Sequence, residues 1–155
     1  LPAKNEHQCH NPTCDTICEC NHSRSLNILV AEDNIVNQKL ITKMLKRLGH
    51  DSAIAANGQI AMDLLEENSP NSFDAVLMDV QMPIMDGLEA TRRLRAKGFI
   101  DLPILALTAS VKQCDYKDLG FNDWLPKPTP LKQLQEKLQK SVRRGEKLAI
   151  DNPKQ

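Results

Sequence analysis

Five polar side chains stand at the ends of short apolar runs in this sequence. Glu32 and Asp33 directly follow one run, and Asp79 directly follows another. Thr108 ends a third run, and Lys127 follows a fourth, shorter one. Carboxylates that lie close together repel one another, and a hard divalent cation, of which Mg²⁺ is the natural candidate, relieves that repulsion. These residue types therefore indicate a metal-assisted phosphate site.

The chemistry that these residues favour is phosphoryl transfer. The transferred group passes through a loose transition state whose charge is spread over three oxygens, so each oxygen needs a positive or hydrogen-bonding partner. We expect Asp33 and Asp79 to bind the metal directly, and Asp79 to be the nucleophile that forms an acyl phosphate. The Thr108 hydroxyl with the Ala109 amide, and the Lys127 ammonium, are expected to bind the other oxygens.

The elements that must position these residues are strands and helices in alternation. Apolar runs that alternate with segments of helical periodicity are typical of repeated βα units and a mostly parallel sheet. The predicted strands are residues 28–31, 51–55, 75–79, 102–107 and 123–125. The predicted helices are residues 34–48, 58–67, 87–97 and 110–119, and a last helix that Thr129 caps, with Pro130 at its first position, and that ends near Arg144.

The strand order follows from which strands are most apolar. The first, third and fourth are nearly continuous apolar runs and should be central, whereas the second and fifth should be edges. Right-handed crossovers then favour the order 2-1-3-4-5, in which the ends of the first and third strands share one crevice. We therefore predict an α/β fold, a (βα)5 doubly wound parallel sheet.

Helical periodicity also predicts which side chains are buried. The residues expected to face inward in the first two helices are Val36, Leu40, Ile41, Met44, Leu45, Leu48, Ile60, Ala61, Leu64 and Leu65. In the third helix they are Leu88, Thr91 and Leu94, and the basic row expected to face water is Arg92, Arg93, Arg95 and Lys97.

The composition fits one folded domain between polar segments. The chain has 155 residues, of which 41% are hydrophobic, and its 20 basic and 20 acidic side chains cancel. We therefore expect no direct binding of nucleic acid and no membrane contact by this segment. The predicted organisation is a flexible linker or tail at 1–25, a folded domain at 26–142 and a polar tail at 143–155, which leaves no room for a DNA-binding effector.

The beginning of the chain raises two further expectations. It starts at Leu1 and shows no signal-peptide pattern, so we expect a piece of a longer protein with a cytoplasmic location, whether or not that protein is membrane-anchored. Its first 22 residues contain four of the five cysteines, Cys9, Cys14, Cys18 and Cys20, among three histidines. Their spacing matches no familiar zinc finger, so a linker is favoured over a metal site; Cys114 is expected to be a small core residue.

The order of these motifs resembles a known family, the receiver domain of two-component response regulators. The resemblance covers residues 26–142. It rests on Glu32-Asp33-Asn34, on Asp79 followed by Met82-Pro83-Ile84-Met85-Asp86-Gly87, on Leu107-Thr108-Ala109, and on Lys127-Pro128. The string from Glu32 to Gln38 is most similar to receivers of hybrid histidine kinases. The implied fold is flavodoxin-like.

The resemblance implies a role for each matching residue. Asp79 accepts a phosphoryl group from the phosphohistidine of a histidine kinase or histidine phosphotransfer protein. Asp33, Asp79 and the Gln81 carbonyl bind Mg²⁺, and Glu32 acts through water. Thr108 and Lys127 bind phosphoryl oxygens.

Two further implications concern switching and the backbone. Trp124 occupies the position of the aromatic residue that couples to Thr108 when a receiver switches. The bond between Lys127 and Pro128 is expected to be cis.

Three features depart from the family pattern. Glu32 replaces the commoner Asp, and Trp124 is bulkier than the usual Tyr or Phe. The stretch from Thr108 to Lys127 is about three residues shorter than is typical, which removes about one helical turn. We expect these departures to affect how phosphorylation is converted into an output.

Several alternatives stay open from the sequence. We favour the receiver portion of a hybrid sensor histidine kinase, in which the domain catalyses its own phosphorylation and dephosphorylation; whether the parent is such a kinase is left open. A stand-alone response regulator and a phosphate-independent interaction module are the alternatives. A phosphatase of the haloacid dehalogenase type is disfavoured because it needs a second Asp where Gln81 stands. A flavodoxin needs a hydroxyl- and glycine-rich loop after the first strand, where Glu32 and Asp33 stand.

Overall fold

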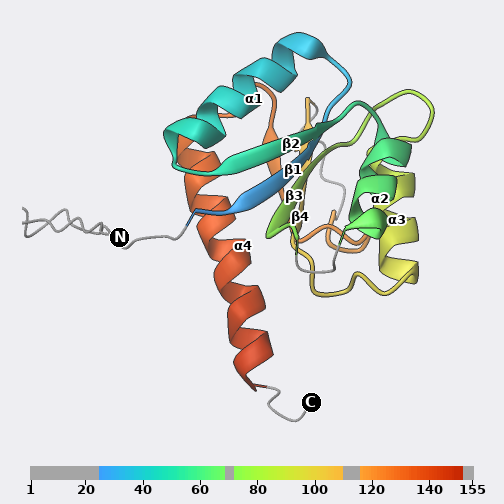
Figure 1. Cartoon of the computed structure of the whole chain (residues 1–155), viewed down its shortest axis with the longest axis vertical. Coiled ribbons are helices and arrows are strands. Elements are labelled where there is room, and N and C mark those ends of the chain that lie inside the picture. The colour runs from blue at the N-terminus through green and yellow to red at the C-terminus, as the bar shows by residue number, and fades with distance from the viewer. Residues whose placement is uncertain (1–24, 69–71, 110–115, 152–155) are drawn as a thin grey trace, which may run out of the picture.

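The fold is a five-stranded parallel sheet with helices on both faces (Figure 1). The computed structural model describes residues 25–68, 72–109 and 116–151, with side chains up to residue 142. The elements are β1 Asn27–Ala31, α1 Ile35–Arg47, β2 Asp51–Ala55, α2 Gly58–Glu67, β3 Ala75–Asp79, α3 Gly87–Ala96, β4 Ile104–Thr108, β5 Asp123–Pro126 and α4 Leu131–Asp151. The strand order β2-β1-β3-β4-β5 confirms the predicted topology.

The core is divided by the sheet into two clusters. Alternate residues of a strand point to opposite faces, so each central strand contributes to both clusters. The α1/α4 cluster contains Ile28, Val30, Ile41, Leu45, Leu77, Leu105, Leu107, Leu134 and Leu138. The α2/α3 cluster contains Leu29, Ala31, Ala61, Met62, Leu65, Val76, Met78, Ala90, Leu94 and Ala106. Figure 1 shows the same division, with α2 and α3 on one side of the sheet and α1 and α4 on the other.

The ends of the helices are fixed by side chains in the loops that follow the strands. The Asn34 side chain accepts hydrogen bonds from the amides of Val36 and Asn37 and thereby caps α1. Asp86 caps α3 by accepting from the Glu89 amide. Each helix therefore begins directly beside the carboxyl end of a strand.

Two predicted helix boundaries differ from the structure. For the helix predicted at 110–119, residues 110–115 and with them Cys114 lie outside the described residues, and 116–120 form a turn. At the other boundary, α4 continues to Asp151, past the predicted end near Arg144. The Thr129 hydroxyl donates to the Pro126 carbonyl (2.7 Å) instead of capping α4, and the helix begins one residue after Pro130.

Some predicted helix faces are also wrong. Val36, Leu40 and Ile60 are exposed, and in α2 Met62 is buried instead. The reason is that α1 and α2 touch the sheet along a narrower strip than their apolar residues cover. Arg95 is partly buried by backbone carbonyls and does not face water with the rest of its row.

The predicted 1–25 segment and its Cys and His residues lie almost wholly outside the described residues, so the domain limits stay predictions. Among the residues that were described, no helix combines the length and apolarity needed to cross a membrane.

Candidate functional site

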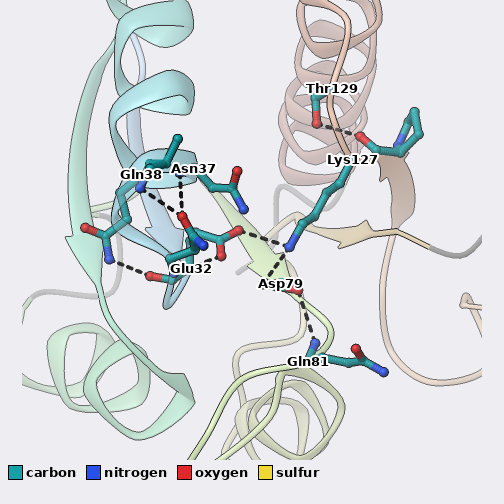
Figure 2. A network of polar contacts seen from close by, with 10 residues as sticks. Glu32, Asn37, Gln38, Asp79, Gln81, Lys127 and Thr129 are labelled. Carbon is teal, nitrogen blue, oxygen red and sulfur yellow. Dashed lines mark hydrogen bonds and ion pairs between the residues drawn. The ribbon is translucent and has the colours of Figure 1, made fainter.

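The centre of the candidate site is an ammonium group between two carboxylates (Figure 2). Lys127 Nζ lies 2.8 Å from Asp79 Oδ2 and 3.2 Å from Glu32 Oε2. The two acidic side chains are 5% and 1% exposed respectively, and that of Lys127 is 22% exposed. All three come from the carboxyl ends of β1, β3 and β5, which parallel strands bring to one edge of the sheet.

Glu32 is held by its neighbours in the chain and by β2. Its amide donates to the Ala55 carbonyl (2.9 Å), and its Oε1 accepts from the Asn34 amide (3.1 Å). The Gln38 side chain donates to the Glu32 carbonyl (2.7 Å), which ties the first turns of α1 to the end of β1. This role of Gln38 was missed, although the residue belongs to the string that carries the family resemblance.

Asp79 is positioned by the loop that follows β3. Its Oδ1 accepts from the Gln81 amide (3.1 Å), and the Gly87 amide donates to the Val80 carbonyl (3.0 Å). A methyl group on Gly87 would lie 2.2 Å from the Asp79 carbonyl oxygen, so only glycine allows α3 to start this close to the carboxylate. The loop therefore folds back on the strand end and restricts where Asp79 can point.

Thr108 and Lys127 are joined through the backbone. The Lys127 amide donates to the Thr108 carbonyl (2.9 Å), and Thr108 pairs with Pro126 in the β4–β5 register. The Thr108 side chain is buried, and its Oγ1 accepts a hydrogen bond from the Tyr116 hydroxyl at 3.3 Å. The peptide bond between Lys127 and Pro128 is cis, as the resemblance implies.

The site concentrates negative charge where water is scarce. Burial raises the pKa of Glu32 above its usual 4.5, and the neighbouring Asp79 raises it further, against the opposing effects of the Asn34 amide and Lys127. Burial lowers the pKa of Lys127, but its hydrogen bonds and charge contacts with Asp79 and Glu32 outweigh that effect, so the pKa rises above 10.5. Lys127 therefore stays charged and partly neutralises the two acids.

The same edge of the sheet offers oxygen ligands for a metal ion. One carboxylate oxygen each from Glu32, Asp33 and Asp79 can be chosen so that all lie within 4.8 Å of one another. Asp33 is exposed and the other two are buried, so the cluster opens toward solvent on one side. Carboxylate oxygens in this number suit a hard cation that keeps part of its water shell, and the residues present therefore fit Mg²⁺.

Trp124, the predicted switch residue, packs against the α2/α3 cluster, and its described charge contact is with Lys137. It lies on β5, where Lys137 Nζ stands 4.5 Å from the centre of its ring. Lys137 also pairs with Asp123 Oδ1 (3.2 Å) and donates to the Trp124 carbonyl. The Gln81 amide contacts Asp79, but the predicted role of its carbonyl stays a prediction.

The comparisons with known proteins agree with this fold. Residues 28–139 match the family model of the response regulator receiver domain, which is more than half of the chain. The protein therefore belongs to the receiver domain family, as the motifs predicted.

Two of the similar proteins are a histidine kinase and the receiver domain of another. The hybrid signal transduction histidine kinase I of Dictyostelium discoideum is 42% identical over 117 residues, which cover 70% of this chain but 7% of that protein. The receiver domain of the sensor histidine kinase PA1611 from Pseudomonas aeruginosa PAO1, solved with a magnesium ion in its active site cleft, has a TM-score of 0.69 at 39% identity. That match covers 77% of this chain and 98% of the other.

A third relative was solved with its partner. A chain in the complex of the Saccharomyces cerevisiae histidine phosphotransfer protein Ypd1 with the receiver domain of Ssk1 matches with a TM-score of 0.66 at 30% identity. The match covers 74% of this chain and 86% of that chain.

Proposed function

We propose that this domain accepts a phosphoryl group from a phosphohistidine onto Asp79 and passes it on or releases it by hydrolysis. The observation that carries the proposal is the position of Lys127 Nζ between Asp79 and Glu32. Together with Asp33, these two carboxylates form a group that can share a metal ion. A purely structural ion pair does not need the third carboxylate, nor an opening to solvent.

The transfer forms one bond and breaks another. A carboxylate oxygen of Asp79 attacks phosphorus, and the phosphorus–nitrogen bond of the donor breaks. The bonding electrons return to the imidazole nitrogen, which is left as a neutral imidazole after protonation from solvent. In hydrolysis, a water oxygen attacks the phosphorus of the acyl phosphate, and the bond between phosphorus and the Asp79 oxygen breaks. Its electrons return to the Asp79 carboxylate, the water proton goes to solvent, and free phosphate leaves.

Each residue of the site has a task in this reaction. The Lys127 ammonium lies close enough to Asp79 to move from the carboxylate to a phosphoryl oxygen without leaving the site. The Thr108 hydroxyl donates to a second oxygen. Glu32, Asp33, Asp79 and the Gln81 carbonyl would hold Mg²⁺, which supplies charge neutralisation at the phosphoryl oxygens when bound.

The wider context is proposed from the relatives. Hybrid histidine kinases are among the similar proteins, and one matching receiver was solved with a histidine phosphotransfer protein. We infer that this domain exchanges phosphoryl groups with such a protein, as part of a hybrid kinase. Mixing the purified domain with a phosphorylated histidine phosphotransfer protein should move the phosphoryl group between them; a failure to transfer in either direction contradicts this context.

The central experiment is incubation with phosphoramidate and Mg²⁺, followed by intact mass measurement. The wild-type chain should gain one phosphoryl group, which hydroxylamine removes because it cleaves acyl phosphates. Asp79→Asn should gain none. Asp86→Asn is the matched control, because Asp86 caps α3 and Asn caps helices equally well. The proposal is wrong if the wild type gains nothing or if Asp79→Asn gains as much.

A further inference from the structure

One aromatic side chain that the family pattern does not single out contacts the catalytic hydroxyl. Tyr116 is buried in the α2/α3 cluster, and its hydroxyl donates to Thr108 Oγ1 at 3.3 Å. Its ring packs edge-to-face against Phe121, with the ring centres 6.0 Å apart and the planes at 83°. The position of the Tyr116 hydroxyl is therefore fixed by packing as well as by the hydrogen bond.

The turn that carries Tyr116 is anchored on two neighbouring elements. Arg95 of α3 donates through Nε to the Gly120 carbonyl (2.9 Å), and the Asn122 amide donates to the Ile104 carbonyl of β4 (2.8 Å). Within the turn, the Phe121 amide donates to the Tyr116 carbonyl (3.0 Å). These bonds connect the backbone of Tyr116 to the rigid part of the fold.

Trp124, in contrast, is engaged at the edge of the sheet. The ammonium of Lys137 lies over its ring and is itself fixed by Asp123. An inward movement of the indole toward Thr108 would give up this cation–π contact. Both aromatic residues pack in or against the α2/α3 cluster, but Tyr116 hydrogen-bonds to Thr108, whereas the Trp124 ring contacts Lys137 of α4.

We propose that Tyr116 is a positioning residue that orients the Thr108 hydroxyl for phosphoryl transfer, and that it takes the part expected of Trp124. The proposal rests on the phosphoacceptor function of Asp79. A threonine hydroxyl has one proton to donate and two lone pairs that accept. Tyr116 donates to one lone pair of Thr108 and so does not take up the Thr108 proton, and the hydrogen bond restricts rotation of the threonine side chain.

This arrangement makes Tyr116 a reporter of the state of Asp79. A phosphoryl group on Asp79 that accepts from Thr108 pulls on the same hydroxyl that Tyr116 holds. We therefore expect phosphorylation to change the environment of the Tyr116 ring and of the turn 116–120. This turn belongs to the connection between Thr108 and Lys127, which the sequence predicts to be about three residues shorter than is typical of receivers.

The kinetic test compares variants that each remove one buried hydroxyl. Phosphorylation by phosphoramidate at saturating Mg²⁺ should be about three- to tenfold slower in Tyr116→Phe than in the wild type. In a Thr108→Val background the same change should have no further effect, because Tyr116 acts through Thr108. Thr91→Val is the matched control, since Thr91 Oγ1 is buried and has no hydrogen-bond partner in the described part of the chain. Its rate should equal that of the wild type.

A spectroscopic test needs no substitution at Tyr116. The chain has one tyrosine and one tryptophan, so fluorotyrosine and fluorotryptophan each give one assigned fluorine NMR signal. Phosphorylation should shift the tyrosine signal in the wild type, and Thr108→Val should abolish most of that shift.

The outcomes separate the two proposals. If the wild type gains no phosphoryl group at Asp79, the proposed function itself fails. If the wild type is phosphorylated normally, three results refute the role of Tyr116. The Tyr116→Phe variant reacts at the wild-type rate, or it is slowed no more than Thr91→Val. Alternatively, Tyr116→Phe slows phosphorylation by the same factor in the Thr108→Val background as in the wild type. The role is also refuted if phosphorylation leaves the fluorotyrosine signal unshifted but shifts the fluorotryptophan signal, and if Thr108→Val abolishes that tryptophan shift.

Discussion

Two partly buried cations, Lys127 and Arg95, show how differently the same kind of charge can be used in one small domain. Lys127 Nζ faces two carboxylates at the carboxyl edge of the sheet. The Arg95 guanidinium faces neutral oxygens: the carbonyls of Gly120 (2.9 Å) and Leu102 (2.8 Å), the Phe99 carbonyl and Asn122 Oδ1.

The pKa values of the two groups shift in opposite directions. Burial lowers the pKa of Arg95, and the nearby Asp101 only partly offsets this. The carboxylates raise the pKa of Lys127 despite its burial. The backbone carbonyls around Arg95 are fixed by the fold, so its guanidinium cannot exchange them for other partners while the domain stays folded. The Lys127 ammonium lies between two carboxylates and can move from them to a phosphoryl oxygen. We therefore expect Lys127 to control the reaction and Arg95 to control stability.

The largest expected effect is on the reaction at Lys127. Lys127→Ala should lower the rate of phosphorylation about 100-fold, as removal of one donor to a charged transition state does elsewhere, while Mg²⁺ still binds. The rate of mass gain with phosphoramidate measures the first effect and calorimetric titration the second. Lys127→Arg keeps the charge and should retain more activity than Lys127→Ala. An unchanged rate in Lys127→Ala would remove this residue from the mechanism.

The next largest effect separates Arg95 from the site. Arg95→Met should lower the free energy of unfolding by about 2 kcal/mol, because several carbonyls lose their donor at once, and urea denaturation measures this loss. Arg92→Met is the matched control: Arg92 lies on the same helix, is exposed and pairs only with Glu89 among the described residues, so it should change stability little. If Arg95→Met slows phosphorylation as much as Lys127→Ala, the division of roles is wrong.

The smallest effect concerns a basic side chain that is kept neutral. His50 is buried, and its Nδ1 accepts from the Leu26 amide at 3.2 Å. Burial lowers the pKa of His50 below 6.5, against the charges of Asp74 and Asp51. The unfolded chain therefore binds the proton more readily, and the folded state should lose stability as the pH falls below about 6.5, by about 1.4 kcal/mol for each unit of pKa depression.

This pH dependence can be assigned by one substitution. His50→Asn retains an acceptor for the Leu26 amide and removes the titration, so its urea midpoint should fall less between about pH 8 and about pH 5. Glu32 acts in the opposite sense, because its raised pKa lets the folded state gain stability on protonation, and it is present in both chains. Equal pH profiles for the two chains would show that His50 contributes nothing.

The difference between the two cations also explains what the sequence could reveal. Glu32, Asp79 and Lys127 come directly after apolar runs, and the most apolar runs indicate which strands are central. The close approach of these three side chains at one edge of the sheet could therefore be predicted. Arg95 lies in the middle of a polar helical face, and its partners come from the loop that directly follows α3 and from residues 120 and 122. Nothing local marks it, and the same holds for the contact of Tyr116 with Thr108.

The helices were predicted less completely than the strands for a related reason. A central strand is buried on both faces, so every residue carries the signal, as in β3 and β4. A helix has an apolar stripe whether the whole stripe packs on the sheet or part of it is exposed to solvent. In α1, Val36 and Leu40 belong to the stripe but are exposed. Sequence periodicity cannot tell these two cases apart.

The register of β4 and β5 has a consequence for how relatives of this domain are recognised. Thr108 lies opposite Pro126, and the Lys127 amide binds the Thr108 carbonyl, so hydrogen bonds between strands fix the spacing of the two polar residues in space. The number of residues that connect them is then free to change during evolution. A search pattern that demands a constant gap between the threonine and the lysine will overlook shortened domains of this kind, whereas one that aligns the two strands and lets the gap vary will find them.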